Sequence, residues 1–114
     1  MKFLLLIYEA EQRFNSQTPD AMQTEVGEYY AFGKEFAGAI QGGNALQLTH
    51  TAKTVRVRDG QTSITDGPFA ETKEQLGGYY VVEAADADEA ARIGAKIPGA
   101  RYGCVEVRPV MTFS

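Results

Sequence analysis

Residues 76–84 read LGGYYVVEA, and this stretch decides the fold because tyrosine and valine occupy both of its alternating faces. Residues 2–8, KFLLLIY, are likewise apolar on both faces. A strand with one face in water would alternate apolar and polar residues. Both segments are therefore predicted to be central strands of a sheet that is covered on both sides.

A long helix is predicted between these two strands. Thr18 is a suitable N-cap and Pro19 suits the first helical position. Apolar residues then recur at three- and four-residue spacing as far as Ile40, and Gly42-Gly43 is expected to end the helix.

The middle of the chain is predicted to form a hairpin. Residues 53–58 and 61–65 alternate in polarity around Asp59-Gly60, which favours a tight turn. Residues 45–48 are a candidate for a further short strand.

A second helix and a last strand complete the pattern. Asp86 and Glu89 have the spacing of a capping box, and Pro98-Gly99 is expected to end the second helix. The last strand is predicted over residues 103–110. The order β-α-β-hairpin-β-α-β predicts a ferredoxin-like α+β fold with an extra hairpin, in one domain over residues 1–114.

Two helices can cover only one face of such a sheet. The simplest cover for the other face is the same face of a second copy, which predicts a two-fold homodimer with a space between its two sheets.

Composition excludes several kinds of protein. The chain has 114 residues, 44% of them apolar, and a net charge of -4. Such a chain suits one globular domain, and its acidity argues against nucleic acid as the main partner, so we expect none. With one cysteine, Cys104, and one histidine, His50, a Cys/His zinc site within one chain is excluded, and we expect no metal. Cys104 is expected to be a buried structural thiol.

The first residues do not resemble a secretory signal, because their apolar run is only about five residues long. No run is long enough for a membrane span, so we expect a cytoplasmic protein that does not contact a membrane.

Residues 66–78, DGPFAETKEQLGG, carry a resemblance that extends over essentially the whole chain. The sequence resembles the DGPF-domain branch of the YCII-related family, and the resemblance implies a dimeric α+β barrel. Classical relatives are thought to use a His/Asp pair with the histidine near the first helix. No histidine occurs there in this chain, and His50 follows later, so that pair is not carried over. DGPF proteins are often encoded beside alternative sigma factors, which implies a regulatory context.

The same segment supplies the candidate catalytic residues. Asp66 or Glu71 could act as a general base, and Lys73 could hold an anionic group, if the segment lies over the mouth of the space between the sheets. Phe69 is a candidate ligand contact. The alternative is that Asp66-Gly67-Pro68 is simply a turn and that the charges after it form a solvated ion pair.

Three further residues are candidates for ligand binding. Arg56 would suit a carboxylate or phosphate, although a solvated strand face is the other interpretation. Tyr8 and Tyr80 rank first among five tyrosines that either pack in the core or place hydroxyl groups in a pocket.

The predicted function is binding of an unidentified small molecule, with acid-base catalysis of an elimination, isomerisation or hydrolysis as its enzymatic form. No organic cofactor is expected, because no phosphate-binding glycine loop opens a helix. Whether the protein is an enzyme stays open. The alternative is a non-catalytic interaction module that contacts a regulator and is linked to an alternative sigma factor.

Overall fold

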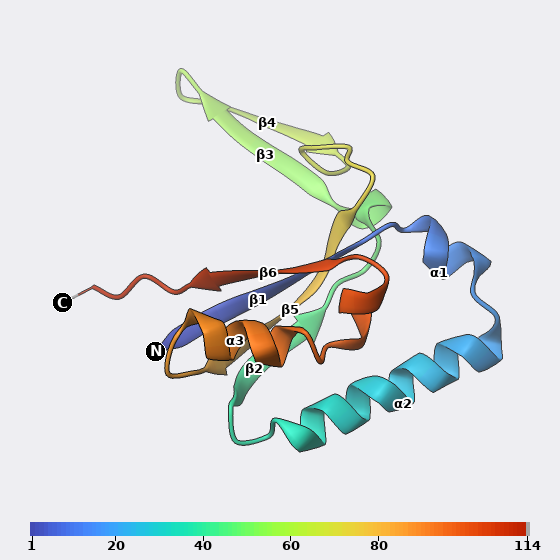
Figure 1. Ribbon diagram of the computed structural model, residues 1–114. Coiled ribbons are helices and arrows are strands. Elements are labelled where there is room, and N and C mark those ends of the chain that lie inside the picture. Colours follow the sequence, from blue (N-terminus) through green and yellow to red (C-terminus); the bar gives the residue numbers. More distant parts are fainter. Residues whose placement is uncertain (114) are drawn as a thin grey trace.

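The computed structural model describes residues 1–113 and has a four-stranded antiparallel sheet at its centre (Figure 1). Its strands are β1 (Lys2–Glu9), β2 (Ile40–Ala45), β5 (Gln75–Glu83) and β6 (Cys104–Pro109), in the spatial order β2-β5-β1-β6. The two segments that are apolar on both faces therefore form the central strands, as predicted.

Three α-helices and two short 3-10 helices connect the strands. The α-helices are α1 (Gln12–Ser16), α2 (Pro19–Glu35) and α3 (Ala87–Gly94), and the 3-10 helices are η1 (Thr49–Thr51) and η2 (Pro98–Arg101). Both predicted caps form: the Thr18 hydroxyl accepts a hydrogen bond from the Ala21 amide, and the Asp86 carboxylate accepts one from the Glu89 amide. The fold is the predicted ferredoxin-like α+β arrangement. None of the helices among the described residues has the length and apolar character needed to cross a bilayer.

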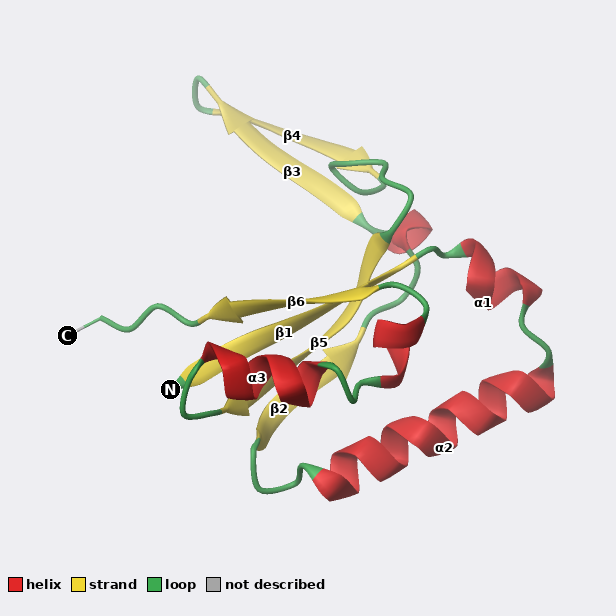
Figure 2. Cartoon of the chain, in the orientation of Figure 1, coloured by secondary structure: helices red, strands yellow, loops and turns green. Residues whose placement is uncertain are grey.

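The core lies between the helices and one face of the sheet (Figure 2). Phe3 and Leu5 of β1 are completely buried, as is Val82 of β5. Ile93 of α3 and Phe32 of α2 belong to the same cluster. We call this the inner face of the sheet.

The outer face of the sheet is also apolar. Cross-strand pairs place Leu4 opposite Val81 and Leu6 opposite Tyr79. These four side chains are only half-buried, whereas Phe3, Leu5 and Val82 on the inner face are fully buried.

A separate hairpin leaves the body of the molecule (Figure 1). It consists of β3 (Lys53–Arg58) and β4 (Gln61–Asp66), which form a two-stranded sheet of their own, and we call residues 53–66 the arm. Asp59 and Gly60 have φ of 51° and 73°, as the predicted tight turn requires. The arm leaves Val55, Val57 and Ile64 more than half exposed.

The predicted end of the long helix is wrong. Helix α2 ends at Glu35, and Ile40 begins strand β2, which contains Gly42 and Gly43. A Cβ atom on Gly43 would lie 2.5 Å from the Tyr79 carbonyl oxygen, so glycine is required by the close approach of β2 to β5. The expected short strand at residues 45–48 shares only Ala45 with β2.

The expectation of a buried Cys104 is also wrong. Its side chain is exposed, and the residue pairs with Tyr8 on the outer face.

Candidate functional site

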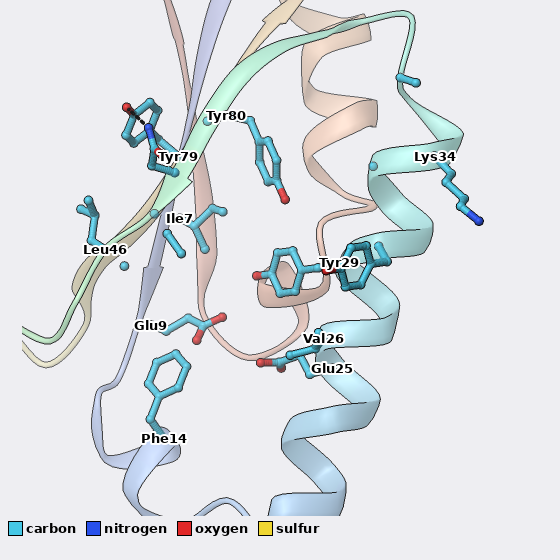
Figure 3. A pocket seen from close by; sticks show the side chains of 18 residues that line it. Ile7, Glu9, Phe14, Glu25, Val26, Tyr29, Lys34, Leu46, Tyr79 and Tyr80 are labelled. Carbon is cyan, nitrogen blue, oxygen red and sulfur yellow. Dashed lines mark hydrogen bonds between the residues drawn. The ribbon is translucent and has the colours of Figure 1, made fainter.

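A cavity of about 750 Å³ lies between α2 and the inner face of the sheet (Figure 3). Its walls come from β1, β2, β5 and α2, with Phe14 of α1 at one end. The walls are mainly apolar, and the volume falls within the range that holds small organic ligands.

Two carboxylates, Glu9 and Glu25, form the polar end of this cavity, and the guanidinium of Arg13 is bonded to both. An Nη atom of Arg13 donates to Glu9 Oε2 at 2.9 Å and to the two carboxylate oxygens of Glu25 at 2.9 and 3.1 Å. Glu9 is 5% exposed and Glu25 is 13% exposed, so both charges lie largely out of water. We call Glu9, Arg13 and Glu25 the charged cluster.

The local sequence explains how this cluster is assembled. Glu9 continues the inward-facing set of β1 after Phe3, Leu5 and Ile7, so its carboxylate points toward α2. Arg13 stands four residues later on α1, and its guanidinium lies 4.0 Å from the ring centroid of Tyr102.

Helix α2 presents a matching stripe to the cavity. Glu25, Tyr29 and Gly33 follow one another at four-residue spacing and therefore share one helix face. Gly33 has no atoms within 4 Å of the position that a Cβ would take. The absence of a side chain at this position contributes to the open space.

The Tyr29 phenol lies close to the charged cluster. Burial, together with the negative charges of Glu9 and Glu25, raises its pKa to about 12. Gly99 of η2 packs against this group: a Cβ there would lie 2.9 Å from the Tyr29 hydroxyl and would collide with Glu9 Oε1. Tyr29 therefore remains a neutral hydrogen-bonding group at ordinary pH.

Tyr80 forms part of the cavity wall. Its ring packs on Phe32 with 5.0 Å between ring centroids, and burial raises its pKa. Gly78, two residues earlier on the same face of β5, pairs with Ile7, and a Cβ there would lie 3.1 Å from the Asn44 carbonyl oxygen of β2.

Within residues 1–113, no group of three or more histidine, cysteine or acidic side chains is arranged to hold a metal ion. The charged cluster itself has only two carboxylates, which are already bonded to Arg13. Carboxylates and a guanidinium in this arrangement can form hydrogen bonds to a ligand and can accept a proton from it.

Of the residues that the sequence suggested for the site, Tyr80 lines this cavity. Tyr8 belongs to the other parity of β1 and so points to the outer face, beside Cys104. Arg56 lies on the arm.

The acidic and basic candidates after β4 lie outside the cavity of one chain. Asp66 is 84% exposed and forms an ion pair with Lys53 at 2.6 Å. Phe69 is 82% exposed, and Glu71 and Lys73 are exposed in the segment between β4 and β5. The structure thus does not gather these residues around the cavity.

Sequence reasoning missed the charged cluster, and it ranked Tyr29 below Tyr8 and Tyr80 among the five candidate tyrosines. The sequence did contain a signal for Glu9. The inward-facing positions of β1 are apolar up to Ile7, and the next position of the same face is the charged Glu9. For Glu25, the signal was its four-residue spacing to Tyr29, which places both side chains on the same face of the helix. No sequence rule indicated that these two elements would face one another.

Residues 1–114 match the YCII-related domain family. The chain belongs to the YCII-related family. The resemblance seen in the sequence is therefore confirmed at the level of the family.

One relative in sequence and one solved structure are similar to this chain. The chain is 32% identical to an uncharacterized protein of Rhizobium meliloti (strain 1021) over 117 aligned positions, which cover 99% of this chain and 94% of the relative. The fold is similar to that of a 5-chloro-2-hydroxyhydroquinone dehydrochlorinase from Burkholderia phenoliruptrix, solved in complex with 2,5-dihydroxybenzoquinone. That comparison has a TM-score of 0.50 and 17% identity, and it covers 97% of this chain and 94% of the other. At this identity the similarity concerns the fold.

Proposed function

We propose that this member of the YCII-related family binds a small organic molecule in the cavity between α2 and the sheet. The observation that carries the proposal is the almost fully buried carboxylate of Glu9 at the polar end of an otherwise mainly apolar cavity. A few fixed polar groups in an apolar pocket are typical of small-molecule sites. A protein with a similar fold was solved in complex with 2,5-dihydroxybenzoquinone, which supports a small organic ligand for this fold.

Acid-base catalysis on such a ligand would use the charged cluster. Glu9 or Glu25 is placed to accept a proton from a molecule in the cavity, and water is largely excluded from both carboxylates. The reaction classes expected from the sequence, which are elimination, isomerisation and hydrolysis, can each use such a base.

A filled cavity tests the proposal directly. Gly33→Leu places a side chain in open space on the cavity wall, on a helix that tolerates leucine well. We expect this variant to fold and to lose the thermal shifts that wild type shows across a panel of small aromatic compounds. Gly27→Leu on the same helix is the matched control, because Gly27 is exposed and does not line the cavity. If Gly33→Leu retains every shift, the cavity is not the binding site.

The candidates of the DGPF segment are tested in the same panel. Asp66→Asn and Lys73→Met should leave the thermal shifts unchanged if the cavity of one chain is sufficient. If either variant abolishes them, then the segment of residues 66–74 contributes to the site, as the sequence suggested.

We also propose that the chain forms a homodimer through the outer face of its sheet. The half-buried apolar pairs Leu4 with Val81 and Leu6 with Tyr79 support this proposal. The exposed apolar residues of the arm support a protein contact as well, and a second copy is the partner we infer. Recovery of a different, stoichiometric protein partner would instead favour a regulatory interaction module.

A further inference from the structure

The charges on the walls of the cavity do not balance. Glu9 and Glu25 both line it, whereas Arg13 approaches them from α1 and a single one of its nitrogen atoms serves both carboxylates. Lys34 also lines the cavity, but its side chain projects away from the two carboxylates (Figure 3). The polar end of the cavity therefore has an excess of negative charge.

One carboxylate oxygen is left for a ligand. Oε2 of Glu9 is bonded to Arg13, whereas no hydrogen bond within residues 1–113 engages Oε1, which lies beside Gly99 and the Tyr29 hydroxyl. An oxygen of a carboxylate that is 5% exposed has lost most of its water, and it gains strongly from a donor that replaces it.

The remaining walls near this end are aromatic. Phe14 lies below Glu9 in Figure 3, and Tyr29 and Tyr80 lie above it. The faces of such rings attract cations, most strongly where water is excluded. Carboxylates and ring faces together disfavour an anion and favour a positive charge.

We propose that the ligand is an organic cation, namely a small apolar or aromatic molecule with a protonated primary amine that donates to Glu9 Oε1. This inference rests on the proposed function and adds the chemical class of the ligand. The apolar part of the molecule then lies against cavity-lining side chains of α2 and β5, among them Val26 and Tyr80.

Three ligands of nearly equal size separate the effect of ligand charge on binding from the effect of ligand shape. Phenethylamine is cationic, phenethyl alcohol is neutral and phenylacetate is anionic at neutral pH. Isothermal titration calorimetry should show that wild type binds phenethylamine about tenfold or more tightly than phenethyl alcohol, and that phenylacetate binds most weakly. The preference should weaken as salt is added, because charge attraction is screened.

The Glu9→Gln variant tests whether the Glu9 carboxylate causes the preference for the amine over the alcohol. It keeps the shape of the side chain and removes the charge, so we expect about tenfold weaker binding of the amine and unchanged binding of the alcohol. Glu35→Gln is the control, because Glu35 is exposed on α2 and does not line the cavity. If Glu9→Gln fails to fold, Glu25→Gln removes the other negative charge of the cluster and should also weaken binding of the amine, but by less, because both oxygens of Glu25 are already bonded to Arg13.

The outcomes distinguish this inference from the proposed function. Equal binding of amine and alcohol by wild type, with both lost in Gly33→Leu, would overturn the cationic ligand and leave the binding cavity intact. Absence of binding for all three probes and for the whole aromatic panel would overturn both. If wild type prefers the amine and neither Glu9→Gln nor Glu25→Gln weakens binding of the amine, the assignment of the preference to this cluster is overturned.

Discussion

At the scale of single residues, Arg13 compensates the negative charge of the two carboxylates at the polar end of the cavity. It is the cation that both Glu9 and Glu25 contact, and it lies against the Tyr102 ring. Removing one partner from a largely buried ion pair costs more than the pair itself contributes, because the remaining charge is left without compensation.

Replacing Arg13 is therefore expected to destabilise the protein. Arg13→Met should lower the free energy of unfolding by about 2 kcal/mol, somewhat less than the loss of a fully buried partner, because Arg13 is 21% exposed. Urea unfolding at neutral pH measures the change. The matched control is Arg101→Met, whose partner Glu28 forms an exposed ion pair that water screens. A larger loss for Arg101→Met than for Arg13→Met would contradict the arrangement of the charged cluster.

Tyr29 predicts a pH dependence at the alkaline end. Its pKa is about 12 in the folded protein, against an ordinary value of 10.0. Below pH 10 both folded and unfolded chains keep the proton, so Tyr29 adds no pH dependence there. Between pH 10 and pH 12 the unfolded chain loses the proton first, and stability falls with rising pH.

Spectrophotometric titration of the tyrosines checks this directly. Tyr29→Phe should remove a step near pH 12, and Glu9→Gln should move that step to lower pH without restoring the ordinary value, because burial is the main cause of the shift. Loss of a step near pH 10 in Tyr29→Phe would show that the phenol is not buried beside the carboxylates.

At the scale of elements, the outcome of the sequence reasoning depended on whether the decisive interaction was local. The start of α2 and the cap of α3 were predictable, since Thr18 and Asp86 act on amides three residues away. The end of α2 was not. Ile40 fits the helical spacing, but pairing of β2 with the edge of β5 outweighs that preference. The charged cluster was missed for the same reason, because α1, α2 and β1 meet only in the folded chain.

Two glycine substitutions test how tightly these elements pack. Gly27→Ala lies in α2 with open space around the new Cβ, so it should stabilise the protein by about 0.5–1 kcal/mol through better helix propensity. Gly99→Ala should destabilise it by about 1–3 kcal/mol, because the methyl group would meet Glu9 and the Tyr29 hydroxyl. Thermal unfolding followed by circular dichroism measures both. Equal effects of the two substitutions would contradict the close packing of η2 on the charged cluster.

At the scale of the whole molecule, one chain is unusually spread out. Its radius of gyration is 16.1 Å, whereas a compact domain of this length has roughly 13 Å. The molecule is only 19 Å thick along its shortest axis, and the arm stands away from the body. An isolated two-stranded hairpin is marginally stable in water, so the arm gains from a surface to pack on. These features favour an assembly of two chains.

The last prediction concerns that assembly. Leu6 lies on the outer face, between Tyr79 of β5 and Glu106 of β6. In the proposed dimer, Leu6→Glu would bury a charge without a partner, so the variant should be a monomer at micromolar concentrations where wild type is a dimer. Light scattering coupled to size-exclusion chromatography gives the molar mass. Gln23→Glu adds the same charge to the exposed surface of α2 and should remain dimeric. Because Leu6 is only half-buried in one chain, the Leu6→Glu monomer should still unfold cooperatively, which separates loss of the interface from loss of the fold. A wild-type molar mass of one chain would show that the outer face is not covered by a second copy.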